Sequence, residues 1–416
     1  MKNPTDLHGT DFGKARAPVA RRFGVLIPAL LLVSLAPSAV SHDARLQTVD
    51  PGLTAHEWGT FTSVADIDGT AVDWLPLAGP KDLPIFVEHF RTAGFKGGVS
   101  ATVRMETPVL YFYSTHDTDL SVHVSISKGL ITEWYPHASR VTPNAPEQAV
   151  FSQMSEEGGS IAWDSVTAVP GSSVDFPRES RDSRYYAARE TASVPLSVKT
   201  SAGEQHEKFL FYRGVANFPV PLSARVVPPN RVLVQNLGQQ SIPGLVLFER
   251  RGEKIGYREI NRLDNSALAD LPELSGSLES LRSDIEAILI SQGLFADEAR
   301  AMVQTWDDSW FEEGSRLFYI VPKPFVDSVL PLSIAPVPAE TVRVFVGRIE
   351  LVTPATEKAI ADAISSGDRG TLKKYDRFLQ PILDIMIQKE TDPVHEEQLE
   401  KTLEAVLSSE ITRERR

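Results

Sequence analysis

Two glutamates stand among large apolar residues in segments that have the composition of β-strands. Glu57 lies in HEWGTFTSV at residues 56–64, and Glu106 lies in TVRMETPVLYFYS at residues 102–114. A carboxyl group in apolar surroundings has a raised pKa and can serve as a general acid or base. These two residues are therefore the candidate catalytic groups. The alternative is that each belongs to a structural ion pair.

Further charged residues occupy positions where strand alternation places them beside apolar neighbours. Successive side chains of a strand point to opposite faces, so Arg104 and Glu106 are expected on the face of Leu110 and Phe112. An isolated buried charge is costly, so these charges are expected to pair with one another. The candidate binding residues of this cluster are Trp58, Arg104, Glu133, Arg189, Glu190 and Arg213.

This cluster is expected to be compact, whether it is a polar pocket in an apolar sheet or a structural group of ion pairs. A sheet edge protected by inward-pointing charges would have the same pattern. The residues that we predict to lie within salt-bridge reach are Arg104, Glu106 and Arg213, with Glu133 or Glu190 as partners and Glu57 or Trp58 at the border.

Standard catalytic and metal-binding signatures are absent from the sequence. It contains no HExxH, no phosphate-binding glycine loop, no dinucleotide fingerprint and no G-x-S-x-G. It also contains no cysteine, which excludes disulfides, thiolate metal ligands and a cysteine nucleophile. No pair of histidines has a ligand spacing that indicates a metal site. No metal-ligating residue is therefore predicted, and the cofactor is unknown.

Many short segments with strand composition are separated by turn residues, a pattern typical of an antiparallel sandwich or open barrel. Asp68-Gly69 is expected to form a hairpin turn between two of them. The predicted fold is mainly β, with one β-rich domain at residues 54–352. Its strands are expected at residues 57–64, 70–77, 102–114, 119–127, 129–135, 159–169, 207–218, 223–235, 244–261, 316–321 and 341–352.

Helical periodicity interrupts this pattern twice. An αα-hairpin is predicted as an insertion at residues 274–313, with Trp306 and Trp310 on its buried face. The acidic residues of TWDDSWFEEG, at residues 305–314, then fall largely outward. Thr353-Pro354 supplies an N-cap and a proline at the first helical position, so residues 353–416 are expected to form a helical tail appended to the domain.

The beginning of the chain has the features of a secretory leader. Arg21 and Arg22 precede an apolar run, and Ala39-Val40-Ser41 supplies small residues for cleavage, so residues 1–41 are predicted to be a signal peptide. We expect a secreted or periplasmic protein with no stable membrane insertion after processing. The net charge of −13 disfavours nucleic acid as a partner.

Several strings resemble an uncharacterised family of secreted bacterial proteins. They are HEWGTFTSV, VRMETPVLYFYS, LITEWYP, YYAARET, EKFLFYRGV and SWFEEGSRLFYIVP, and they extend over roughly residues 56–353. That family has no established activity, fold or ligand, so the resemblance implies secretion and one integrated unit but no catalytic residue. The helical tail falls outside it.

Three functions are compatible with these observations. The first is a binding or scaffold module with an aromatic and charged cleft, acting on an unknown extracellular ligand or protein. The second is a carboxylate-dependent hydrolase of an extracellular polymer such as a glycan. The third is a periplasmic metal-binding protein, because an N-terminal His42 would offer copper both its amine and its imidazole.

The leader makes a testable prediction about processing. We expect the mature chain to begin near His42, because the small residues before it suit a signal peptidase. N-terminal sequencing of secreted material checks this, and recovery of Met1 in that material would contradict it.

Overall fold

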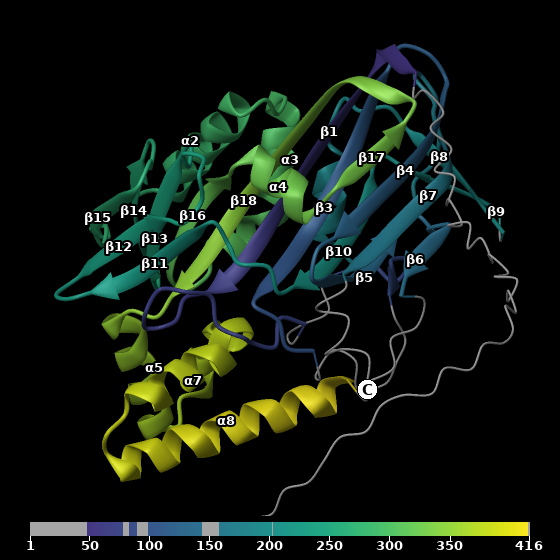
Figure 1. Ribbon diagram of the computed structural model, residues 1–416. Helices are drawn as coiled ribbons and strands as arrows, with labels where there is room; N and C mark the ends of the chain where they lie inside the picture. Colours follow the sequence, from purple (N-terminus) through teal and green to yellow (C-terminus); the bar gives the residue numbers. More distant parts are fainter. Residues whose placement is uncertain (1–47, 78–82, 90–98, 144–157, 202, 415–416) are drawn as a thin grey trace, which may run out of the picture. The chain divides into compact units, whose positions relative to one another are not determined.

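The computed structural model describes residues 48–77, 83–89, 99–143, 158–201 and 203–414, so the predicted leader lies outside the described residues. Its central element is a nine-stranded sheet with the order β14-β13-β16-β18-β1-β3-β10-β5-β2 (Figure 1). β1 and β18 pair in parallel, and the other neighbours pair antiparallel. The strands are β1 (Val49–Val64), β2 (Glu88–His89), β3 (Val103–Ser114), β5 (Gly129–Tyr135), β10 (Leu210–Ala216), β13 (Leu245–Arg251), β14 (Lys254–Ile260), β16 (Gly314–Val321) and β18 (Val337–Leu351).

Two smaller sheets cover one face of the large sheet, which we call the inner face. Leu53, Ala55 and Phe61 of β1 belong to the core between these layers. The mainly β sandwich with open sheets is thereby confirmed. The smaller sheets contain β11 (Leu222–Val227), β12 (Arg231–Asn236) and β15 (Ser266–Asp270), and β17 (Leu332–Ala335), β4 (Thr118–Ile126), β7 (Gly159–Ala168), β8 (Leu196–Thr200), β9 (Gly203–Glu207) and β6 (Arg140–Thr142).

One predicted strand is wrong. Residues 70–77 contribute only the isolated bridges Ala65–Ala71 and Trp74–Ala101. The expected turn does form, because Gly69 has a φ of 91°, which a glycine adopts without strain. The turn therefore leads into a loop and not into a paired strand.

The predicted helical hairpin packs on the opposite face, which we call the outer face. It consists of α2 (Leu278–Ser291) and α3 (Ala296–Trp310). Trp306 and Trp310 are 1% and 0% exposed, as predicted, and share a core with Trp58 of β1. A short 3₁₀ helix, η3 (Arg184–Arg189), contributes Tyr185 and Tyr186 to the same core.

β1 is therefore covered on both faces. Its burial is continuous from Ala55 to Val64, because neither set of alternating side chains reaches solvent. Charged residues in this strand consequently need partners from other elements.

The C-terminal helices pack on the sheet domain more closely than an appendage would. Val64 and Trp74 share a core with Ile382 and Phe378 of the tail. Thr353 caps the first tail helix through its hydroxyl, which accepts from the backbone of Thr356. The remaining elements are α4 (Lys323–Val329), α5 (Pro354–Ser366), α6 (Arg369–Lys374), η4 (Asp376–Phe378), α7 (Leu379–Lys389) and α8 (Pro393–Glu414).

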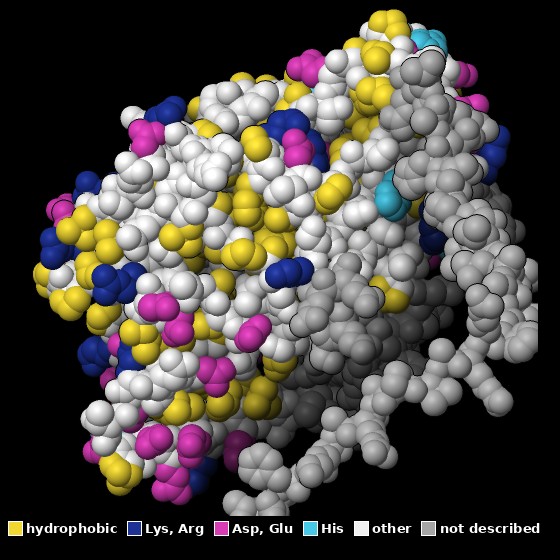
Figure 2. All heavy atoms as spheres, in the orientation of Figure 1, with side chains coloured by type: hydrophobic (Ala, Val, Ile, Leu, Met, Phe, Trp, Pro, Cys, Tyr) yellow, Lys and Arg dark blue, Asp and Glu magenta, His cyan; other side chains and the backbone are white. Residues whose placement is uncertain are grey.

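The surface of the tail is rich in acidic groups. Figure 2 shows Asp and Glu side chains gathered over the C-terminal helices, which agrees with the net charge of −13. None of the described helices combines the length and apolar character needed to cross a membrane.

The burial of the hairpin gives a stability prediction. Trp306→Ala removes a fully buried indole and should cost roughly 3–5 kcal/mol of unfolding free energy. Ile290→Ala on the same hairpin is the control, because Ile290 is 44% exposed. Urea denaturation of both variants checks this, and equal midpoints would contradict the packing.

Candidate functional site

The charged residues predicted from alternation form a row on the outer face of the sheet. Arg104 Nε lies 3.4 Å from Glu106 Oε1, and Glu106 is buried while Arg104 keeps a side-chain exposure of 12%. Arg377 of η4 also forms an ion pair with Glu106. Glu106 therefore lies between two guanidinium groups, which compensate its charge.

Arg213 and Glu133 extend this row across the next two strands. They are directly opposite in the pairing of β10 with β5. Arg213 also donates from Nε and Nη2 to Thr107 Oγ1 at 3.3 and 3.2 Å. Trp58 is fully buried on the same face. The prediction that these residues lie together is thus confirmed for Arg104 and Glu106, and Arg213 faces Glu133 as expected.

The face predicted for Arg104 and Glu106 is wrong, because β3 contains a β-bulge. Trp58 pairs with Val109 and Thr60 pairs with Glu106, so two steps along β1 correspond to three along β3. The extra residue reverses the alternation. Leu110 therefore points to the inner core, while Arg104 and Glu106 point outward.

Thr107 marks this bulge with a φ of 45°. A β-branched residue rarely adopts this left-handed conformation, and doing so costs on the order of 1–3 kcal/mol. Pro108 follows it and lacks the N–H that a regular ladder would use. The local sequence thus ends the regular pairing beside the charged row.

Glu57 is not part of the row, because it points to the inner face. Tyr212 donates from its hydroxyl to Glu57 Oε1, and Arg343 donates from Nε to Glu57 Oε2 at 2.6 Å. Arg343 Nη1 also reaches Asp327 of α4 at 2.9 Å. Burial raises the pKa of Tyr212, and the Glu57 carboxylate raises it further. Burial alone would lower the pKa of Arg343, but Glu57 and its other neighbours raise it overall.

Arg189 and Glu190 also lie outside the row, contrary to the prediction. Arg189 forms a bidentate pair with the buried Glu207, at 2.9 and 2.6 Å. Tyr185 donates to the same carboxylate at 3.0 Å. Burial raises the pKa of Glu207 although Arg189 opposes that shift. Glu190 is exposed at the end of η3, because the 3₁₀ helix does not follow the period of a strand.

Sequence reasoning missed a second group of ion pairs that continues the row. Arg348 of β18 binds Glu312 at 2.6 Å and Glu350 at 3.3 Å, and Glu350 binds Arg316 at 3.0 Å. Arg348 and Arg377 both donate to the hydroxyl of Ser309. The acids of residues 305–314 are therefore not all outward, since Glu312 lies against Arg348. The sequence signal that could have found this group is strand alternation, which places Arg348 and Glu350 on one face of β18.

His56 links β1 to the helical hairpin in a similar way. Its Nδ1 lies 2.8 Å from Glu298 Oε2, and the Tyr113 hydroxyl donates to Glu298 Oε1 at 2.9 Å. Burial and the Glu298 carboxylate raise the pKa of Tyr113. Glu298 also accepts from the backbone of Phe295, so it caps α3 at the same time. The buried Glu298 carboxylate thus caps α3 and also pairs with His56.

These contacts bear on the chemistry expected of Glu57 and Glu106. The two carboxyl groups point to opposite faces of one sheet, so they cannot flank a single glycosidic bond. Each is buried and already paired, Glu57 with Arg343 and Glu106 with Arg104 and Arg377, so neither is placed to exchange a proton with a substrate. In the described ranges, no group of three His, Cys, Asp or Glu residues could hold a metal ion.

A cavity opens instead where β16 separates from β18, and we call it the β18 slot. It has a volume of about 190 Å³. Its lining residues are Pro243, Gln292, Ile320, Val321, Pro322, Lys323, Thr341, Val342, Arg343 and Val344. The last paired residues of the two strands are Val321 and Phe345. The slot exists because Pro322 lacks an N–H for the ladder and leads the chain into α4.

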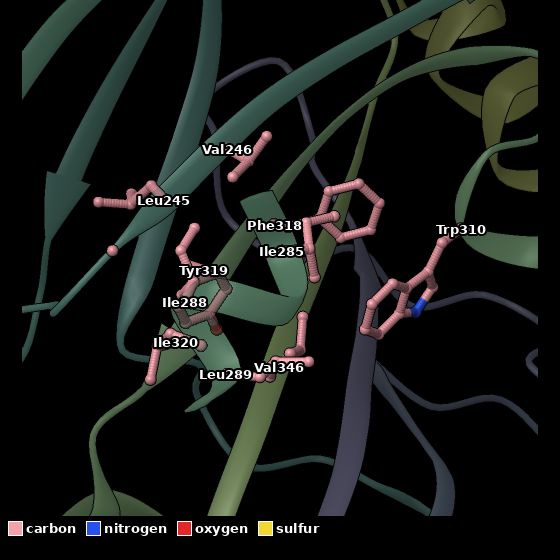
Figure 3. A pocket seen from close by; sticks show the side chains of 11 residues that line it. Leu245, Val246, Ile285, Ile288, Leu289, Trp310, Phe318, Tyr319, Ile320 and Val346 are labelled. Atoms are coloured by element: carbon pink, nitrogen blue, oxygen red, sulfur yellow. The ribbon is translucent and has the colours of Figure 1, made fainter. Parts of the chain in front are cut away.

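A small apolar recess adjoins the slot beneath α2. It has a volume of about 20 Å³, room for a group of methyl size, and it shares Ile320 with the slot. Figure 3 shows side chains of α2, the end of α3, β13, β16 and β18 around it, among them Ile285, Trp310 and Val346. Ligand sites usually combine apolar walls with a few polar groups.

Comparison with known proteins identifies no family for the chain. No family model matches the chain, and no curated protein matches it. Among solved structures it is similar to the yeast delta-COP-I mu-homology domain complexed with Dsl1 WxWxV peptide, with 11% identity, a TM-score of 0.25 and coverage of 72% of this chain and 96% of that one. The same domain without the peptide matches with 8% identity, a TM-score of 0.25 and the same coverage. At this TM-score the likeness supports neither a fold assignment nor a function.

The charged row gives a prediction that separates architecture from catalysis. Glu106→Gln leaves Arg104 and Arg377 without their carboxylate, and Arg213→Met removes the charge that faces Glu133. If the row is structural, each variant should lose roughly 3–5 kcal/mol of unfolding free energy. Thermal and urea unfolding measure this loss.

Glu190→Gln is the matched control, because Glu190 is exposed and a surface substitution of this kind changes stability by less than about 0.5 kcal/mol. Unchanged stability of Glu106→Gln, with loss of a ligand or an activity, would contradict the structural role.

Proposed function

We propose that this protein is an extracytoplasmic binding module whose ligand occupies the β18 slot. The observation that carries the proposal is the cavity of about 190 Å³ beside an incompletely paired strand, together with an apolar recess that shares Ile320 with it. Sites of this kind bury most of a ligand against apolar walls and orient it with a few polar groups. Here those groups come from Gln292, Lys323 and Thr341.

The composition of the slot favours binding over hydrolysis. None of the residues that line the slot or the recess is Asp, Glu or His. These are the residues that most often carry general acid–base catalysis, from within hydrogen-bond reach of the substrate. The ionisable residues in the lining, Lys323 and Arg343, form ion pairs with Asp327 and Glu57. The slot therefore offers contacts and no acid–base pair.

Secretion is part of the same proposal. The predicted leader at residues 1–41 and the acidic composition of the chain support a protein that acts outside the cytoplasm on an extracellular ligand or protein. His42, on which the metal-binding alternative depends, lies outside the described residues. The described residues contain no group of three His, Cys, Asp or Glu that could hold a metal ion.

A carboxylate-dependent hydrolase is the second candidate, and the conformation of Thr107 favours it. Backbone strain concentrates at functional sites, and this strained residue adjoins Glu106 and bonds to Arg213. The ion pairs of Glu106 with Arg104 and Arg377 weigh against it, because they already occupy the carboxylate that would have to reach a substrate.

The proposed site predicts how a probe should bind. Anilinonaphthalene sulfonate, which fluoresces in apolar surroundings, should bind the folded protein at the slot. Gln292→Trp places an indole at a lining position and should weaken binding by about tenfold, or about 1.4 kcal/mol.

Ser291→Trp is the matched control, because Ser291 is exposed and does not line the slot. Fluorescence titration measures both variants alongside the unsubstituted protein. Equal affinities of the two tryptophan variants would contradict a site in the slot.

A further inference from the structure

The slot borders a strand edge with a defined pattern of backbone groups. Ala65 N donates to Glu350 O, so the even-numbered residues of this part of β18 direct their backbone groups toward β1. The odd-numbered residues direct their backbone groups away from β1, toward the side of β16. Along the chain, Phe345 is the first of them that pairs with β16. The register of β18 with β1 is regular from Glu340 onward. Thr341 and Arg343 therefore direct an N–H and a C=O each into the slot.

No strand of the described chain pairs with this side of β18 before Phe345. Its pairing partners in the described ranges are β1 along its length and β16 from Phe345 to Leu351. Thr341 and Val342 are half-buried. An edge of this kind is complementary to another extended backbone, which offers acceptors and donors at the same spacing.

The charges around the slot are already compensated within the protein. Lys323 Nζ lies 2.7 Å from Asp327 Oδ2, and Arg343 is held by Glu57 and Asp327. A ligand at this place consequently needs no charge of its own. The recess, on the outer-face side of the same gap, adds room for one small apolar group.

We propose that the occupant of the slot is an extended, uncharged peptide segment of another protein, which adds to the free edge of β18. Its backbone bonds to Thr341 and Arg343 in the position that β16 leaves at Pro322, and one methyl group of a small side chain such as valine points into the recess. This proposal rests on the proposed function, since it names the ligand class of the same slot.

The probe is a fluorescent, end-capped hexapeptide in which valine alternates with serine and threonine. A second peptide of the same sequence carries N-methyl groups on alternate amides, which prevents strand addition on that edge. The protein is tested unsubstituted, as Thr341→Pro and as Thr341→Ala. Proline removes an N–H that makes no bond within the sheet, whereas alanine keeps it.

We expect the unmodified hexapeptide to bind, and Thr341→Pro to weaken it at least about tenfold. Thr341→Ala should bind within about twofold of the unsubstituted protein, and the N-methylated peptide should fail to bind. Circular dichroism and the unfolding midpoint show whether Thr341→Pro is folded. If it is not, the comparison of the two peptides on the unsubstituted protein decides alone.

Three results would overturn the inference. Equal binding of the methylated and unmodified peptides would show that the backbone edge is not used. Binding of the naphthalene dye or of decanoate at the slot, without binding of the peptide, would leave the proposed function standing and remove the peptide as its ligand. If the peptide, the dye and decanoate all fail to bind at the slot, the proposed function itself is contradicted.

Discussion

A charge that leaves water has to be compensated where it lies, and β1 brings this requirement to the middle of the fold. Covered on both faces, β1 directs Glu57 inward and His56 outward. Glu57 is met by Arg343 of β18, and His56 by Glu298 of α3. Two adjacent residues thus connect the neighbouring strand β18 and the helical hairpin to one strand. The same requirement at Glu106 recruits Arg377 from the helical tail, which helps to explain why the tail packs on the sheet.

The period of a strand was enough to predict part of this arrangement. Arg213 and Glu133 face each other, and Arg104 pairs with Glu106, because alternation and the cost of isolated charge both required it. The absolute face of Arg104 and Glu106 was not predictable from alternation alone. It depends on the bulge at Thr107, where an extra residue reverses the alternation.

Other features depended on contacts between distant segments. Arg377 lies 271 positions after Glu106 in the chain, and nothing in either local pattern indicates that they meet. The predicted place of Arg189 is wrong because residues 184–189 form a 3₁₀ helix, which directs Arg189 to Glu207 and away from the row. The overall mainly β class and the buried hairpin tryptophans followed from composition and periodicity, which are local properties.

Glu57 and Glu106 are buried and paired, and the β18 slot becomes the place where a ligand is expected. Its origin is local: Pro322 ends β16 and starts α4 while β18 continues. Residue-resolved amide hydrogen exchange of the free protein tests this most directly. We expect rapid exchange of the amide protons of Thr341 and Arg343. The amide protons of Val342 and Val344 should exchange slowly, because their N–H groups face β1. Equal protection of all four amides would contradict it, because the edge of β18 would then already be occupied.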